Sequence, residues 1–215
     1  MYWVYYVYLE KADMKALDFN LKQDIHFDFN QGKAEFKENR LVIFDANAIG
    51  LLRQNLIEEI GFEQAKEFFL KFGYQNGYSD FLQIKVNYDF ESEIELLATG
   101  PVIHTWEGIV SAVPSEIRFD REKDEFYFTG TWKNSYEAEQ HLSFNEFSKE
   151  PVCWSLMGYA TGWCTAFFGK LVIAIEPVCR GKGDSVCKWL IQRPEVWGKE
   201  AQPYLNIYNK IVSGK

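Results

Sequence analysis

The clearest periodic pattern in the chain is helical and lies in residues 45–60. Apolar residues recur there every three or four positions and would share one helix face: Ala48, Leu51, Leu52, Leu56 and Ile60. Gly61 follows as a residue that readily ends a helix. A second helical pattern runs from about Glu63 towards Phe81. The first half of the chain is therefore predicted to contain a pair of consecutive helices.

Beyond Pro101 the pattern changes from helical spacing to alternation. Residues 108–119 and 125–132 predict two strands joined by a charged turn at 120–124. In the second of these strands, Phe126, Phe128 and Trp132 share one face. Residues 170–175 and 186–191 predict two further strands, separated by a tight loop at 180–184. These segments together indicate a mixed or antiparallel sheet.

Capping signals place helices around these strands. Asn134 with Glu137 three residues later resembles a capping box, and Pro151 marks the first turn of a helix that ends at Gly169. A final amphipathic helix begins at about Glu195, after Pro194. Residues 1–40 predict two short strands with a turn at 30–32. The fold class predicted from this order is α+β, with helices flanking the sheet.

Two similar glycine patterns lie in predicted helices, at 73–78 (GYQNGY) and 158–163 (GYATGW). Glycines four residues apart on a helix allow another backbone to approach closely. Close helix packing is the favoured interpretation, ahead of a ligand-binding motif or an old internal duplication.

Composition narrows the classes of function. The 215 residues are 47% hydrophobic and 17% aromatic, which is enough for a sizeable core and favours aromatic-lined pockets. A net charge of −8 argues against direct contact with nucleic acid. No apolar run reaches the length of a membrane span, and the aromatic residues 1–9 lack the basic start of a signal peptide. A cytoplasmic, non-membrane location is expected.

Four cysteines are the strongest chemical signal. Glu176, Cys179 and Cys187 could meet on one hairpin, and Cys153 could join them from the preceding helix. Thiolates and a carboxylate are zinc ligands, and four protein ligands make a structural site. The spacing equally allows a four-thiolate site in which Cys164 replaces Glu176. A third interpretation is that the cysteines are small buried hydrophobic residues and bind no metal.

Three segments resemble the vinyl reductase-like sensor domain of phenol- and xylene-responsive, sigma-54-dependent activators. They are PVCW at 151–154, GYATG at 158–162 and EPVCRGKGDSVC at 176–187. Weaker similarity appears at 51–57, 100–104, 107–110 and 130–135, so the resemblance covers about 25–189. It implies a sensor fold with a zinc-binding hairpin, a small aromatic effector and a homodimer.

The resemblance also implies a set of site residues. The zinc ligands carry over to Cys153, Glu176, Cys179 and Cys187, which leaves Cys164 out. His104 and Trp132 correspond to the residues that hold the hydroxyl of the effector. The position two before the zinc glutamate is usually aromatic in phenol sensors, and here it is Ala174, with Leu97 and Tyr159 as neighbours that could fill the space. A larger or substituted effector is therefore expected.

The domain boundaries follow from these features. Residues 1–40 are assigned to a dimerisation element, 41–192 to the effector-binding domain with its zinc site, and 193–215 to the start of a linker helix. No phosphate-binding loop is present, so an ATPase domain in cis is expected only if the chain is a fragment. Ligand sensing for a transcription activator is the function predicted, without catalysis. The alternative is a stand-alone vinyl reductase-like domain that binds or reduces a tetrapyrrole or another hydrophobic molecule.

Overall fold

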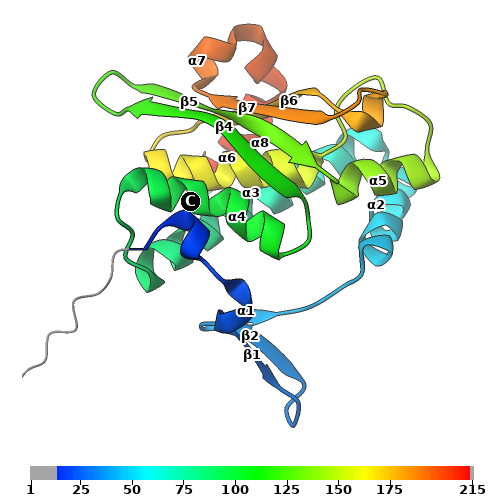
Figure 1. The fold of residues 1–215 in the computed structure, drawn as a ribbon. Helices are drawn as coiled ribbons and strands as arrows, with labels where there is room; N and C mark the ends of the chain where they lie inside the picture. The colour runs from blue at the N-terminus through cyan, green and yellow to red at the C-terminus, as the bar shows by residue number, and fades with distance from the viewer. Residues whose placement is uncertain (1–13, 214–215) are drawn as a thin grey trace, which may run out of the picture.

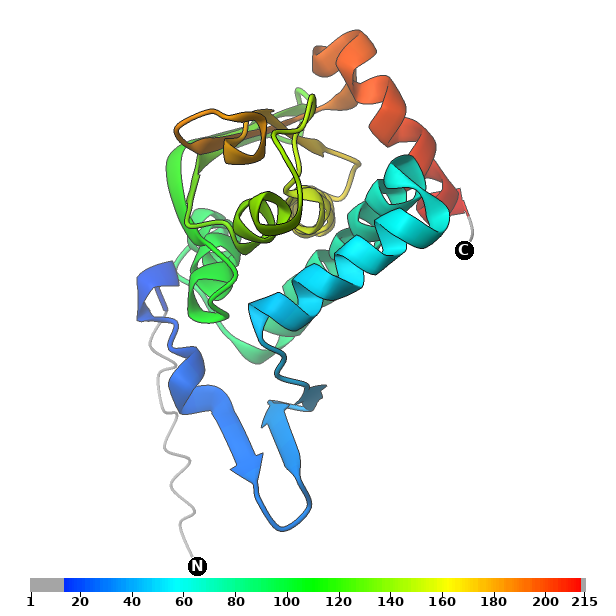
Figure 2. The ribbon, with the colours of Figure 1, turned by 90° about the vertical axis from the view of Figure 1, so that its right-hand side faces the viewer.

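Two long helices follow one another in the first half of the chain, α2 (Ala46–Ile60) and α3 (Phe62–Asn87). They form the cyan pair in Figure 2. The structure is a computed structural model, and it describes residues 14–213. Asp45 caps α2, because its carboxylate accepts a hydrogen bond from the Ala48 amide at 2.8 Å. Gly61 separates the helices at a φ of 88°, where glycine is favoured. The predicted pair is confirmed, although α3 continues six residues past Phe81.

The apolar residues that give α2 its helical period are only partly buried. Leu51, Leu52 and Ile60 are all more than 40% exposed. Among the residues of α2, all of which the structure describes, only Gly50 and Arg53 are buried. The helical period is confirmed: Leu56 packs against the core together with Ile57, whereas Leu51, Leu52 and Ile60 stay largely exposed and Arg53 is buried.

Helix α4 (Glu93–Trp106) was not predicted, because Pro101 suggested a helix boundary. Proline lacks an amide hydrogen, so the Leu97 carbonyl one turn earlier loses its usual helical partner. The Trp163 indole N–H donates to that carbonyl at 3.0 Å instead. Gly100 leaves room for the same indole, which a Cβ at this position would meet at 2.7 Å. A tertiary contact therefore keeps the proline inside a helix.

One antiparallel sheet covers the central helix (Figure 1). Its order is β4 (Ser111–Asp120), β5 (Glu125–Lys133), β7 (Cys187–Gln192) and β6 (Ile173–Val178). Phe126, Phe128 and Trp132 on β5 are each at most 4% exposed, which confirms the predicted alternation. The strand expected at 170–175 lies further along the chain, and its register with β7 shifts between Ile175 and Val178. Glu176 lies two residues after Ala174, on the same face of β6, and is fully buried.

Two helix starts differ from the prediction. Asn134 has a φ of 56°, and Ser135 caps α5 (Tyr136–Phe144) in its place. Helix α6 (Trp154–Phe168) begins three residues after Pro151, with Cys153 at its N-cap, and ends at Gly169 as expected. The Glu137 carboxylate caps α6 rather than α5, because it accepts hydrogen bonds from the Ser155 and Leu156 amides at 3.1 Å each.

The two glycine patterns pack against each other where α3 crosses α6. A Cβ on Gly73 or Gly77 would meet the backbone of α6 at 2.2 Å, and one on Gly158 or Gly162 would meet the backbone of α3 at 2.3 and 2.0 Å. The interpretation as close helix packing is confirmed. Helix α6 is thereby fixed between α3 and the sheet.

The N-terminal elements form an arm below the body in Figures 1 and 2. They are η1 (Ala16–Asp18), α1 (Leu21–Asp24) and a three-stranded sheet of β1 (Ile25–Asp28), β2 (Lys33–Phe36) and β3 (Asn39–Leu41). The predicted turn at 30–32 connects β1 and β2. The aromatic strand expected at residues 1–9 lies outside the described residues.

The C-terminal segment is broken rather than one continuous helix. The tight loop contains η2 (Arg180–Lys182), and β7 is followed by α7 (Pro194–Trp197), η3 (Gly198–Ala201) and α8 (Gln202–Ser213). Gly198 interrupts the helix at a φ of 61°. Within residues 14–213, no helix is long and apolar enough to cross a membrane.

Candidate functional site

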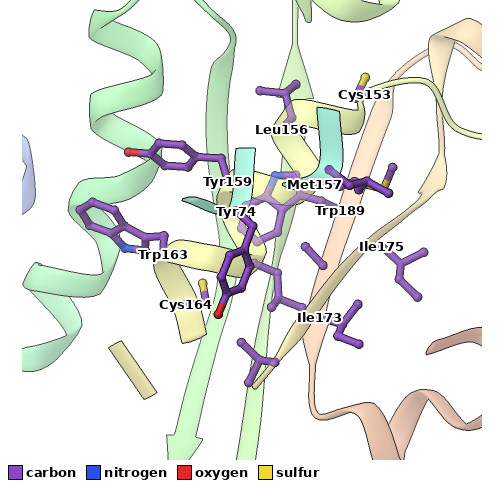
Figure 3. Close-up of a cluster of buried hydrophobic side chains, with 14 of the residues drawn as sticks. Tyr74, Cys153, Leu156, Met157, Tyr159, Trp163, Cys164, Ile173, Ile175 and Trp189 are labelled. Carbon is purple, nitrogen blue, oxygen red and sulfur yellow. The ribbon is translucent and has the colours of Figure 1, made fainter. Parts of the chain in front are cut away.

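A small buried cavity lies between α4, α6 and the inner face of the sheet. It is lined mainly by aromatic and small side chains, namely Gly100, Pro101, His104, Ala112, Phe128, Trp132, Tyr159, Ala160, Trp163, Cys164, Trp189 and Ile191. Helix α4 supplies the first three and α6 supplies four, including Tyr159 and Trp163, whose side chains point towards α4 in Figure 3. Three of the five predicted ligand-binding residues, His104, Trp132 and Tyr159, line this one space.

His104 is the most polar group of the lining, and it is 4% exposed. Burial lowers the pKa of its imidazole to about 3, so the ring is neutral near pH 7. A neutral imidazole has one donor and one acceptor nitrogen. Its ring centroid lies only 3.8 Å from that of Tyr159. His104 can therefore address a hydroxyl group, and Tyr159 packs directly against it.

Tryptophans and a phenylalanine form the wall on the sheet side. Trp132 on β5 pairs with Cys187 on β7, and Gly130 pairs with Trp189, so both indoles stand on the inner face. The missing Cβ of Gly130 makes room for the Trp189 ring, which a Cβ would meet at 2.6 Å. The Trp189 indole N–H is buried and has no hydrogen-bond partner within the described part of the chain.

Trp189 was not predicted as a site residue. Its strand was expected, but the inner face of β7 could be assigned only from its register with β5. The unpaired indole N–H makes Trp189 a second donor at the cavity, besides Trp132.

The other two predicted ligand-binding residues lie just outside the lining. Leu97 is fully buried one turn before Pro101, and its carbonyl holds the Trp163 indole. Ala174 pairs with Ile191, so its side chain is on the same face of the sheet as this lining residue, one strand further from the cavity. Both positions influence the cavity through a neighbour.

The cavity has a volume of about 30 Å³. A cavity of about 150 Å³ is known to accept benzene, whereas about 10–15 Å³ suffices for one water. An aromatic ring therefore fits only if lining side chains move, and the close His104–Tyr159 pair marks where space must open. The lining combines apolar aromatic walls with the neutral His104 imidazole and the Trp189 indole N–H, which suits an uncharged aromatic group with a hydroxyl.

Four potential metal ligands converge at the other end of α6. The ligand atoms of Cys153, Glu176, Cys179 and Cys187 all lie within 4.8 Å of one another, and all four residues are buried. The Cys153 and Cys187 sulfurs are 3.8 Å apart. Zinc–sulfur bonds of about 2.3 Å in a tetrahedron place two sulfurs about 3.8 Å apart. The sulfur spacing therefore fits a tetrahedral zinc ion.

The surroundings of this cluster also fit a metal with thiolate ligands. Backbone amides of Val152 and Arg180 point at the Cys179 and Cys187 sulfurs at 3.5 and 3.4 Å, and the Ser135 hydroxyl lies 3.1 Å from the Cys153 sulfur. Donors of this kind stabilise thiolates and fix ligand positions. One carboxylate oxygen of Glu176 is buried without a hydrogen-bond partner in the described chain. A cation would satisfy it.

Protonation of the cluster depends on its burial. Burial raises the pKa of Glu176 to about 9 and that of Cys153 above its usual value, whereas hydrogen bonds from Cys153 and Cys187 lower the pKa of Cys179. The metal-free cluster therefore retains protons that a cation must displace. Metal binding to such a site weakens as the pH falls.

Cys164 does not belong to this cluster. It lines the aromatic cavity, and Figure 3 shows it at the opposite end of α6 from Cys153. The four-thiolate arrangement, one of the two that the spacing allowed, is therefore not formed. Cys187 and Trp132 are paired across β7 and β5, so the cluster and the cavity are joined by adjacent strands.

Two family models match successive parts of the chain. The model described as "Activator of aromatic catabolism" matches residues 20–120, and the V4R domain model matches residues 132–193. The first match includes His104 and the arm, and the second includes Trp132 and the four clustered ligands.

Two curated relatives are regulators. The phenol regulator MopR of Acinetobacter guillouiae is 34% identical over 175 residues, which is 81% of this chain and 31% of the relative. The transcriptional regulatory protein XylR of Pseudomonas putida is 31% identical over 179 residues, which is 83% of this chain and 32% of that protein. The chain thus spans about a third of the length of these relatives.

A solved structure has the same fold. The phenol-responsive sensory domain of the transcription activator PoxR, determined with phenol, superposes with a TM-score of 0.82 at 29% identity. The match covers 87% of this chain and 93% of that domain.

Proposed function

The chain belongs to the aromatic-effector sensor domains of activators of aromatic catabolism, and we propose that it binds a small aromatic effector in the cavity beside His104 and controls a transcription activator. The observation that carries the proposal is the convergence of His104 and Trp132, from α4 and β5, on one buried aromatic space. A phenol, alkylbenzene or biphenyl-type ring suits this lining.

The proposed binding mode assigns a role to each polar group. The hydroxyl of the effector donates to or accepts from the neutral His104 imidazole, and it accepts from the Trp132 indole N–H. Tyr159 moves away from His104 to admit the ring. Phenol has about seven heavy atoms, so its binding free energy is limited to about −10 kcal/mol, and micromolar affinity requires both the hydrogen bonds and the ring fit.

Binding of phenol to His104→Ala protein tests this mode. An unpaired buried polar group costs about 1–3 kcal/mol, so calorimetry should show affinity weakened roughly 5- to 150-fold. The domain should stay folded, because His104 makes no structural hydrogen bond through its ring within residues 14–213. His26→Ala, an exposed histidine on the arm, is the control and should bind like wild type. Unchanged affinity in His104→Ala removes His104 from the site.

We propose further that Cys153, Glu176, Cys179 and Cys187 hold one structural zinc ion. The sulfur spacing, the amides directed at the sulfurs and the unpartnered Glu176 oxygen support this assignment. The zinc would join the loop before α6 to β6 and β7, and a closed set of four protein ligands leaves it no catalytic position.

Metal analysis of paired variants tests the zinc site. Wild type should contain about one zinc per chain, Cys187→Ala should lose it and fold poorly, and Cys164→Ala should keep it. Loss of metal in Cys164→Ala together with retention in Glu176→Gln would show that the ligand set is wrong.

The remaining partners are part of the same proposal. We propose a homodimer formed through the N-terminal arm, whose Phe29, Ile43 and Phe44 are exposed. We also propose an ATPase domain in cis as the recipient of the signal, with no direct contact between this domain and nucleic acid. Sensing rather than catalysis is proposed, because the cavity lacks the paired groups of an enzyme.

A further inference from the structure

Two tryptophans differ from the others in the bonding of their indole N–H groups. Six of the seven tryptophans lie within the described residues. Four of these six donate the indole N–H to a backbone carbonyl at 2.9 or 3.0 Å, namely Trp106, Trp154, Trp163 and Trp197. Trp132 and Trp189 make no such bond within residues 14–213, and both line the aromatic cavity.

The Trp189 N–H is the more demanding of the two, because it is buried. The residue is 2% exposed, and its side chain points from β7 towards α6 in Figure 3. The rings that it touches belong to Phe128 and Trp132, at centroid distances of 4.7 and 6.1 Å. Neither a phenyl ring nor an indole N–H offers a conventional acceptor atom. Buried donors in native proteins are nearly always paired, so a partner from outside the chain is expected in the cavity.

The sheet places this donor beside the one already assigned to the effector. Trp132 pairs with Cys187 and Gly130 pairs with Trp189, so the two indoles are neighbours on one face of adjacent strands. A Cβ at position 130 would meet two carbons of the Trp189 indole at 2.6 and 2.9 Å. The glycine therefore leaves the indole the space that it occupies, and one wall of the cavity presents two separate N–H donors.

We propose that the Trp189 N–H is a second hydrogen-bond donor to the effector, and that the effector is a phenol with a second, oxygen-bearing substituent. The phenol hydroxyl bonds to His104 and Trp132, and an ether, hydroxyl, carbonyl or nitro oxygen accepts from Trp189. An indole N–H only donates, so it selects an acceptor over an alkyl group. The lining holds no lysine or arginine, which disfavours a carboxylate. The inference rests on the proposed effector site and adds the class of the second substituent.

Pairs of phenols that differ in one acceptor atom test the inference. Methoxyphenol and ethylphenol with the substituent at the same ring position have nearly the same shape, and only the first has an ether oxygen. Calorimetry on the ortho, meta and para pairs gives the preference for methoxy over ethyl. Trp189→Phe keeps an aromatic ring and removes the donor, so it should lower this preference about 2- to 12-fold in at least one pair.

Trp163→Phe is the matched control, because Trp163 lines the same cavity but its N–H is already bonded to the Leu97 carbonyl. This substitution should change the affinities for both members of a pair by the same factor. The preference for methoxy over ethyl should therefore equal that of wild type.

Nuclear magnetic resonance on the wild-type protein tests the bond without a variant. With nitrogen-15 in the tryptophans, the Trp189 indole N–H signal can be assigned through its contacts with the Phe128 ring. It should differ between the methoxyphenol and ethylphenol complexes of the preferred pair, whereas the Trp163 signal should not.

Two results would overturn the inference and leave the phenol site intact. One is an equal methoxy preference in wild type and Trp189→Phe for all the pairs, and the other is a Trp189 signal that is the same in both complexes. Bare phenol needs no second donor, so its binding to wild type is the separate test of the proposed function. A wild type that binds no phenol would overturn the proposed function, and this inference with it.

Discussion

At the scale of single residues, the cavity depends on a histidine held neutral by burial. The same burial has a consequence for stability, since an unfolded histidine has a pKa of about 6.5 and His104 in the folded protein has one of about 3. Between these values the unfolded chain binds the proton more readily. His104 therefore makes the folded state less stable as the pH falls from about 6.5 towards 3.

Urea denaturation across this range measures the effect. The free energy of unfolding of wild type should fall, relative to that of His104→Gln, by up to about 1.4 kcal/mol per pH unit below pH 6.5. Acids whose pKa values are raised, such as Asp80 at about 6, also change the free energy of unfolding with pH. Their contribution is the same in both proteins, so it cancels in the difference between them. If the unfolding free energies of wild type and His104→Gln change in parallel from pH 7.5 to pH 4, His104 becomes protonated in the folded protein.

The residue at position 174 is expected to influence effector size. Ala174 faces the same side of the sheet as the lining residue Ile191. Ala174→Tyr should reduce affinity for dimethylphenol or a biphenyl more than affinity for phenol, because the added ring takes space next to the cavity. Ile175→Phe, on the opposite face of β6, is the control. An unchanged ranking of these ligands in calorimetry would show that position 174 does not limit the cavity.

At the scale of elements, the crossing of α3 and α6 positions the cavity. Both helices bring glycines to the contact, and α6 carries Tyr159 and Trp163 into the cavity from the same turns. Any side chain at the crossing would push α6 away from α3 and disturb both the cavity and the loop that holds Cys153. The glycines are thus required for function through geometry alone.

Gly162→Ala tests the crossing. Its Cβ would meet the Tyr74 carbonyl oxygen at 2.0 Å, which is backbone and cannot rotate away. Thermal or urea unfolding should show a loss of about 1–3 kcal/mol or more. Gly50→Ala on α2 meets only the Gln140 side chain, which can move, so it should be neutral or slightly stabilising. Equal effects of the two substitutions would contradict the close packing.

At the scale of the whole molecule, the N-terminal three-stranded sheet projects from the body, and exposed apolar side chains lie beside it and in its connection to α2. Phe29 is 89% exposed, and Ile43 and Phe44 in the connection to α2 are 72% and 65% exposed. Clustered apolar exposure of this kind usually marks an interface. A second copy of the chain is the proposed partner, and the arm connects directly to α2.

Sedimentation analysis tests the dimer. Wild type should sediment as a dimer at micromolar concentration, and the double variant Phe29→Ser with Ile43→Ser should shift towards monomer. Phenol affinity should not change, because both residues are remote from the cavity lining. Leu17→Ser, also exposed but outside the three-stranded sheet, serves as the comparison. A monomeric wild type would remove the arm as an interface.

Local sequence patterns determined a large part of this protein. The stop of α2 at Gly61, the alternation along β5 and the glycine pairs were predictable because each depends on residues a few positions apart. The cysteine and glutamate spacing narrowed the metal site to two arrangements, and the family resemblance separated them. His104 and Trp132 came from that resemblance, since a histidine three residues after a proline carries no local signal of a cavity.

Tertiary structure alone decided the rest. Pro101 lies inside α4 because the Trp163 indole replaces a lost helical bond, and Glu176 meets the three cysteines because β6, β7 and the loop before α6 converge. The face that α2 turns inward carries the buried Arg53 with the partly buried Leu56 and Ile57, whereas Leu51 and Leu52 stay exposed. Trp189 reached the cavity through pairing with Gly130. Each of these outcomes depends on partners more than 20 residues away or on strand register, and no local pattern contains that information.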